Sequence, residues 1–213
     1  MRDQSYQRII LENKPELAAL NYRLTLTKGE KMPNHVNVRV KFTRALAKLY
    51  LEDYSLIKRK CSERSIVFRL GFYLANDLAE SGLTVDCEYN RNGEKPKSLM
   101  NKHFTYPDII VHSRGDNENN CLVVEVKTPN DTNLDHFRKD REKLIGFTLE
   151  TSYRYEQGVH AYIAATTCSL VWYVNGEIRE HIRYAVDSDT HELSETERSD
   201  NTFDGWYTRC SVR

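Results

Sequence analysis

Residues 107–127 read PDIIVHSRGDNENNCLVVEVK, and this stretch decides the fold that we predict. It holds two short apolar runs rich in β-branched residues, at 107–112 and 121–127. The loop between them is rich in Asn, Asp and Gly. This pattern predicts two antiparallel strands joined by a long turn.

The register of this hairpin decides which side chains meet across it. If the ladder closes with His112 opposite Cys121, then Asp108 lies opposite Glu125. Directly opposite residues have Cβ atoms about 4.5–5.5 Å apart. Two carboxylates that close repel each other unless a proton or a cation lies between them. Because Mg²⁺ prefers carboxylate oxygens, this register predicts a metal site, which a bulge or a one-residue slip would remove.

The second strand carries a further charged group. Side chains alternate across a sheet, so Glu125 and Lys127 share one face, while the apolar Leu122, Val124 and Val126 share the other. A buried charge costs several kcal/mol unless it is paired or bound to a metal. A metal, a water molecule and the Lys127 ammonium would together make a phosphodiester hydrolysis site. The alternative is a structural Lys–Glu pair, because short E-x-K strings are common.

The segments around the hairpin predict an α/β fold with a mixed central sheet. Helical spacing of apolar residues favours a helix at about 38–58 and another from an N-cap at Ser62 to Ser81-Gly82. A third helix follows Pro129 and leads to an apolar run at 159–167, which should pair in parallel with 121–127. The other expected elements are a strand at 84–90, a polar loop to about 102 and a hairpin at Asn175-Gly176. We expect a helical extension at 1–60, a core at 61–185 and an irregular polar tail at 186–213.

Glu63 is a further candidate ligand. It lies three residues before Ile66 and seven before Leu70, at the top of the buried stripe of its helix. A carboxylate placed there could reach a metal on the sheet. The alternative is that Glu63 only stabilises the N-terminus of the helix through its dipole.

Basic residues suggest where a polyanion would bind. The total charge is zero, yet basic residues are in excess in 1–105 and acidic residues in 106–213. Such asymmetry hints at a polyanionic partner. The candidate phosphate-binding residues are Arg69, Arg91, Lys95, Lys97 and Lys102. The alternative for the loop lysines is a solvated surface.

The composition excludes several other classes of protein. At 213 residues and 39% hydrophobic content, the chain suits one globular domain. No apolar run is long enough to span a membrane and no secretory signal is visible, so we expect a cytoplasmic protein without a membrane partner. The five cysteines form no C-x-x-C pair, which argues against structural zinc and disulfides. A P-loop motif is also missing from the sequence.

The motif Tyr106-Pro107-Asp108, followed by Glu125-Val126-Lys127, resembles the signature of PD-(D/E)XK, or restriction-endonuclease-like, nucleases. The element order at 62–167 resembles the α-β-β-β-α-β core of that superfamily, and Glu63 matches its common extra acidic position. The stretch also resembles a group of small bacterial proteins of the superfamily without an assigned activity.

This resemblance implies a divalent metal, Mg²⁺ or Mn²⁺, at Asp108 and Glu125, with Lys127 catalytic. It implies an endonuclease on nucleic acid, with DNA favoured over RNA and with defence or repair as its setting. Cutting of both strands would favour a homodimer. Two alternatives remain open. One is an inactive nuclease-like module that binds nucleic acid or protein, and the other is a different metal-assisted hydrolase on the same sheet.

Overall fold

The computed structural model describes residues 37–99, 103–115 and 117–200. Its helices are α3 (Val38–Lys58), α4 (Glu63–Leu78) and α5 (Leu134–Leu149). The long strands are β1 (Thr84–Cys87), β6 (Ile109–His112), β7 (Leu122–Lys127), β8 (Gln157–Ile163), β9 (Thr167–Val174), β10 (Glu177–Val186) and β11 (Leu193–Asp200). Four two-residue strands lie between β1 and β6: β2 (Arg91–Asn92), β3 (Lys95–Pro96), β4 (Ser98–Leu99) and β5 (His103–Phe104).

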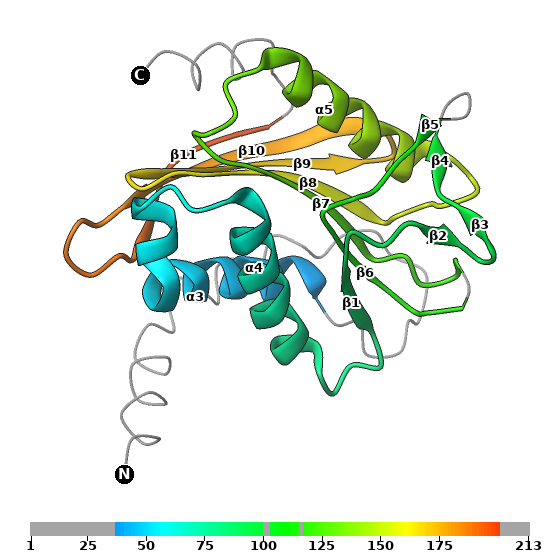
Figure 1. The fold of residues 1–213 in the computed structure, drawn as a ribbon, viewed down its shortest axis with the longest axis horizontal. Coiled ribbons are helices and arrows are strands. Elements are labelled where there is room, and N and C mark those ends of the chain that lie inside the picture. The colour runs from blue at the N-terminus through cyan, green and yellow to red at the C-terminus, as the bar shows by residue number, and fades with distance from the viewer. Residues whose placement is uncertain (1–36, 100–102, 116, 201–213) are drawn as a thin grey trace. The chain divides into compact units, whose positions relative to one another are not determined.

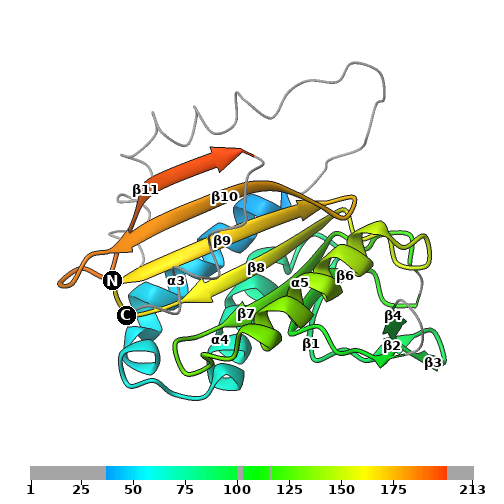
Figure 2. The ribbon, with the colours of Figure 1, turned by 90° about the horizontal axis from the view of Figure 1, so that it is seen from above.

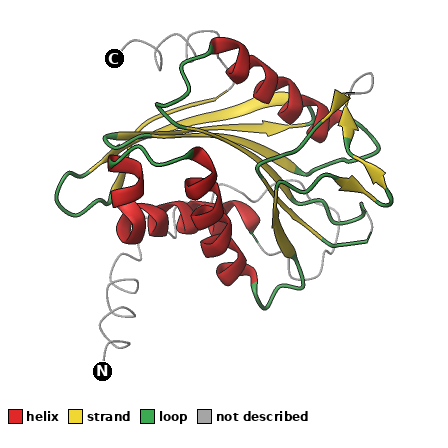
Figure 3. Cartoon of the chain, viewed as in Figure 1, coloured by secondary structure: helices red, strands yellow, loops and turns green. Residues whose placement is uncertain are grey.

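The long strands form one seven-stranded mixed sheet, flanked by helices, in the order β1-β6-β7-β8-β9-β10-β11 (Figure 1). Strands β7 and β8 are parallel, as predicted, because α5 connects them by a crossover. The other pairs in the sheet are antiparallel. Figure 3 shows the helices on both faces of the sheet. The α/β class and the mixed sheet are therefore confirmed.

Two hydrophobic cores hold the helices on the sheet. Below it in Figure 1, α3 and α4 bury apolar residues such as Leu49 and Leu70 against Val124 and Val126 of β7. On the other face, seen from above in Figure 2, α5 covers the sheet with a core that includes Phe147. Each face of β7 is covered by helix, so all six of its residues are buried.

The predicted helix at 38–58 is confirmed, but it is not part of a separate extension. Phe42, Leu46 and Leu49 of α3 lie in the same core as the sheet. The expected boundary at residue 60 therefore cuts through one core. Residues 1–36 of the expected extension lie outside the described residues.

The expected irregular tail at 186–213 is wrong for residues 193–200. This segment forms β11, which pairs with β10 over seven residue pairs from Glu180↔Asp200 to Val186↔Leu193. Its sequence is polar because β11 is an edge strand that leaves most of its side chains exposed. Backbone pairing, rather than an apolar pattern, therefore makes the strand. The rest of the tail, 201–213, lies outside the described part.

The hairpin turn at Asn175-Gly176 follows the sequence closely, whereas strand β1 is shorter than predicted. Asn175 and Gly176 have positive φ angles of 51° and 78°, which a two-residue hairpin between β9 and β10 requires. Strand β1 ends at Cys87, three residues before the expected end, and Glu88 turns with φ 50°. The polar loop expected after it contains the short strands β2 to β4.

Candidate active site

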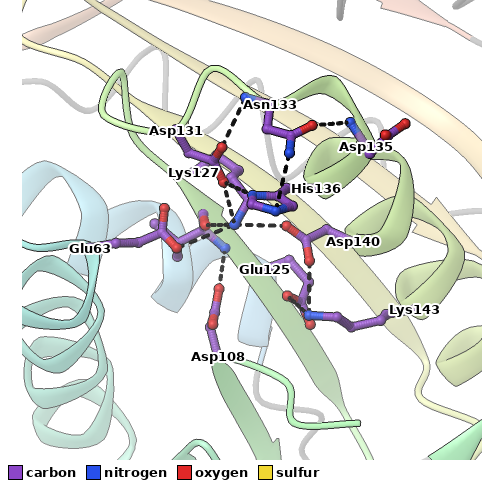
Figure 4. A network of polar contacts seen from close by, with 11 residues as sticks. Glu63, Asp108, Glu125, Lys127, Asp131, Asn133, Asp135, His136, Asp140 and Lys143 are labelled. Atoms are coloured by element: carbon purple, nitrogen blue, oxygen red, sulfur yellow. Dashed lines mark hydrogen bonds and ion pairs between the residues drawn. The ribbon is translucent and has the colours of Figure 1, made fainter. Parts of the chain in front are cut away.

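The predicted register of the β6–β7 hairpin is confirmed. Ile109 pairs with Val124 and Val111 pairs with Leu122, which places Asp108, just before β6, beside Glu125. The Oδ2 atom of Asp108 accepts a hydrogen bond of 2.7 Å from the backbone N–H of Val126. Figure 4 shows the Asp108 carboxylate directed at the backbone of β7 and the Glu125 carboxylate directed at Lys143 of α5.

Glu125 is a buried acid with one unsatisfied oxygen. Its side chain is 1% exposed, and its Oε2 lies 2.6 Å from Nζ of Lys143. Its Oε1 is buried without a hydrogen-bond partner in the part of the chain that the structure describes. Burial, and then the charge of Asp108, raise the pKa of Glu125 well above its usual value. A buried carboxylate oxygen that accepts no hydrogen bond is suited to bind a cation.

Lys127 is surrounded by carboxylates at the end of β7. Its Nζ lies 2.9 Å from Oδ2 of Asp140, 3.2 Å from Oε1 of Glu63 and 3.8 Å from Oδ2 of Asp131 (Figure 4). Burial acts to lower the pKa of Lys127, but Asp140 and Glu63 outweigh burial and raise the pKa. The amine is therefore a fixed positive charge at the site.

Glu63 reaches the site through Lys127. Ser62 caps α4, and its side chain accepts a hydrogen bond from the Ser65 N–H, so Glu63 begins the first turn. The Glu63 carboxylate contacts the Lys127 ammonium, as drawn in Figure 4. Burial raises the pKa of Glu63, and Lys127 counters this in part. Its observed role is to hold the lysine.

Asp140 and Lys143 of α5 are site residues that were not predicted from the sequence. The Asp140 carboxylate bridges the two lysines, with Oδ2 near Lys127 and Oδ1 2.8 Å from Nζ of Lys143. A signal was present: Asp140 lies three residues after Phe137 and four before Leu144, on the buried stripe of α5. A charged residue on an apolar stripe indicates a partner opposite it, here the lysine of β7.

His160 adds a buried imidazole next to the acids. It lies on β8 in register with Glu125, and its ring is 5.7 Å from that of Phe137. Burial lowers the pKa of His160 to about 4, so the ring is neutral at physiological pH. The sequence pattern did not single it out.

The predicted phosphate-binding residues are dispersed. Arg69 is paired with Asp53 through a 2.6 Å contact and with the Tyr73 hydroxyl. Arg91 and Lys95 lie exposed on the short β2–β3 hairpin, as expected for a basic loop. Lys102 lies outside the described residues. In the described part of the chain, the side chain of Asp108 is bonded to the Val126 N–H and that of Glu125 to Lys143. None of the predicted phosphate-binding residues is bonded to either acid.

Lys97 is buried, contrary to the expectation of an exposed loop lysine. Its side chain is 2% exposed. The Nζ atom donates to the Tyr155 hydroxyl at 3.3 Å and lies over four rings, at 5.1 Å from that of Tyr153 and 5.4 Å from that of Tyr89. Burial lowers the pKa of Lys97 to about 8. Its ammonium faces aromatic rings rather than solvent, so we withdraw it as a phosphate contact.

As it stands, the site is an ion-pair network and not a formed metal centre. Within residues 37–99, 103–115 and 117–200, no three His, Cys, Asp or Glu side chains are arranged to hold a metal ion. The carboxylates are instead paired with lysines: Lys143 contacts Glu125, and Lys127 contacts Glu63.

None of the described helices is long and apolar enough to cross a membrane.

Comparisons with protein-family models, with curated proteins and with solved structures each found no match. The function of the chain therefore has to be inferred from the geometry of its site.

The free energy of unfolding should depend on pH through Asp108. Burial is the largest cause that raises the pKa of Asp108, from 3.8 to about 6, and the Val126 N–H and Lys143 oppose it. A group with a raised folded pKa contributes stability that is complete below its unfolded pKa and is lost as pH rises through the folded one. As pH rises from about 4 to about 7, the free energy of unfolding of Asp108→Asn should therefore increase by about 3 kcal/mol relative to that of the wild type.

Urea denaturation in EDTA at both pH values measures this difference. Parallel pH curves for the wild type and the variant would show that Asp108 titrates normally. The control removes a carboxylate from an exposed position, Asp135→Asn at the start of α5, and the gain should be specific to the Asp108 variant.

Proposed function

We propose that this protein is a Mg²⁺- or Mn²⁺-dependent nuclease that hydrolyses phosphodiester bonds of nucleic acid, with DNA favoured over RNA. The observation that carries the proposal is the register that sets Asp108 opposite Glu125, with a buried Glu125 oxygen that has no hydrogen-bond donor among the described residues. Two such carboxylates lower their repulsion by sharing a cation. The adjoining amine of Lys127 gives the site the composition that phosphodiester hydrolysis needs.

Asp108 and Glu125 fit a hard divalent cation. Both offer carboxylate oxygens, which Mg²⁺ and Mn²⁺ prefer. The Oε1 atom of Glu125, which has no hydrogen-bond partner in the described part of the chain, is a ligand atom shielded from solvent. Glu63 would be a third ligand only if it left Lys127. When bound, the ion would polarise a phosphoryl oxygen and lower the pKa of a bound water.

Lys127 would interact with the phosphate of the substrate. Asp140 and Glu63 fix its ammonium in place and keep it protonated. A fixed cation stabilises the negative charge that develops on a phosphate under attack, and it can orient the attacking water. Because these acids already position the amine, little reorganisation is needed when substrate arrives.

The order of elements supports a restriction-endonuclease-like core within the mixed sheet. Helix α4, strands β1, β6 and β7, helix α5 and strand β8 follow the α-β-β-β-α-β order that the motif resemblance implies. The acids lie on the central pair of this set, between α4 and α5. Membership of the PD-(D/E)XK superfamily is the family assignment that we propose.

One observation favours an alternative function. Each of Glu63, Glu125 and Asp140 already has a lysine partner, so these three carboxylates have counter-charges without a metal. An inactive nuclease-like module that binds nucleic acid or protein would have the same network. It predicts salt-dependent binding that Glu125→Ala leaves unchanged and that metal does not affect.

A cleavage assay separates the two functions. Purified protein is incubated with supercoiled plasmid, linear duplex, single-stranded DNA and RNA, each with Mg²⁺, with Mn²⁺ or with EDTA. We expect cleavage of at least one substrate with metal and none in EDTA. Phosphomonoesters and nucleotides serve as controls for another metal-assisted hydrolase. Binding without turnover on any substrate would support the inactive module, and cutting of both strands would direct attention to a homodimer.

A further inference from the structure

The last residue of α3 and the turn that follows it, together called the basic turn, present three consecutive cations to solvent. Lys58, Arg59 and Lys60 are all exposed. Within the part of the chain that is described, none of the three forms an ion pair. Neighbouring Arg64, by contrast, is paired with Glu88 at 3.2 Å. Three adjacent like charges repel one another, and a polyanion relieves that repulsion.

The backbone of this turn is fixed rather than loose. The N–H of Lys60 donates to Ile57 O at 3.0 Å, and that of Cys61 donates to Leu56 O at 2.9 Å, which closes the end of α3. Lys60 has a φ of 54°, in the left-handed region where glycine or asparagine is the usual choice. This conformation sets the direction in which the Lys60 side chain leaves the turn, and the flexible stem carries the ammonium into solvent.

The turn lies at the rim of the candidate site. The Asn130 side chain, in the loop after Lys127, donates to the carbonyls of Lys60 and Cys61 at 3.1 and 3.2 Å. Three residues after Lys60, Glu63 contacts the Lys127 ammonium. The basic turn is therefore joined to the site through Asn130 and through Glu63.

We infer that Lys58, Arg59 and Lys60 bind the phosphodiester backbone of the nucleic-acid strand that enters the site, an inference that rests on the proposed function. Backbone phosphates follow one another along a strand, so a row of cations beside the site contacts the phosphates that flank the scissile one. These contacts are electrostatic, independent of sequence and sensitive to salt. They position the strand, while the acids and Lys127 act on it.

The test measures binding in EDTA, so that it does not depend on catalysis. The turn variant is Lys58→Gln/Arg59→Gln/Lys60→Asn, in which asparagine suits the left-handed position. The control variant, Arg44→Gln/Lys48→Gln/Arg179→Gln, removes the same charge from exposed positions, two of them on α3. Fluorescence anisotropy with short labelled single-stranded and duplex DNA gives the affinity over a range of salt concentrations.

We expect the turn variant to bind at least about tenfold more weakly at low salt, with a slope of log K against log salt smaller by about 2 to 3. The control variant should keep the wild-type slope. Urea denaturation of both variants checks that folding is intact. Equal slopes in the two variants would overturn the inference, as would a wild type that binds anionic lipid vesicles and no oligonucleotide. A wild type that binds DNA through this turn but never cleaves it would refute the proposed hydrolysis and leave the binding surface standing.

Discussion

Glu125→Gln is expected to lower metal-dependent cleavage by about 10³-fold or more. It removes a charged metal ligand that lowers the activation free energy by several kcal/mol, and about 1.4 kcal/mol corresponds to a tenfold change in rate. The amide keeps the size of the side chain, and Lys143 keeps Asp140 as its partner. Mn²⁺ binding, followed by electron paramagnetic resonance, should weaken in parallel. Cleavage and Mn²⁺ binding are therefore measured on the same samples.

The same change should not lower stability at neutral pH. The raised pKa of Glu125 means that its ionised form is disfavoured in the folded chain. The stability that the protonated Glu125 contributes below its unfolded pKa is therefore lost as pH rises through the raised folded pKa. The amide of the variant does not ionise and avoids this loss. The exposed Glu142→Gln, on α5, is the matched control and should keep wild-type cleavage. Full cleavage by the Glu125 variant, with unchanged Mn²⁺ binding, would show that Glu125 is not a metal ligand.

Lys127→Met is the second change with a large expected effect. It should lower cleavage by about 10²–10³-fold, because it removes a fixed cation beside the scissile phosphate. It should also cost about 3 kcal/mol of unfolding free energy, because Glu63 loses its lysine partner and the buried Asp140 keeps only Lys143. Urea denaturation measures the stability, and the plasmid assay measures the cleavage.

Two further variants separate the chemical role of Lys127 from its structural one. Lys139→Met removes an exposed lysine of α5 and should change the free energy of unfolding by about 0.5 kcal/mol or less. Lys127→Arg keeps the charge for Glu63 and Asp140, so it should retain more stability than Lys127→Met, while its larger planar head fits the site less well. If Lys127→Met cleaves normally although destabilised, the lysine is structural only.

The hairpin could be predicted because its information is local. The alternation in LVVEVK fixes which side chains share a face, and two apolar runs around one turn leave few registers. The pairing of Ile109 with Val124 is the register that places Asp108 beside Glu125, as predicted. The Asn-Gly turn was predictable for a similar reason, since only a few residues adopt positive φ.

The network around Lys127 could not be predicted in the same way. Asp140 and Lys143 meet β7 only because the crossover places α5 over that strand, and the rotation of the helix decides which side chains point down. The burial of Lys97 depends on rings from Tyr89, Phe147 and the segment before β8, which are distant in sequence. The failed expectation at β11 has a related cause, because an edge strand needs backbone pairing and no apolar pattern.

The sequence by itself determined the mixed α/β class, the hairpin with its register and the two acids at opposite positions of that register, because each follows from side-chain alternation and turn chemistry over short distances. Only the tertiary structure decided that Lys143 pairs with Glu125, that Asp140 bridges Lys143 to Lys127, and that a basic turn lies at the rim. Ion pairs between separate elements depend on how helices pack on a sheet, and packing is set by the whole core rather than by any one segment.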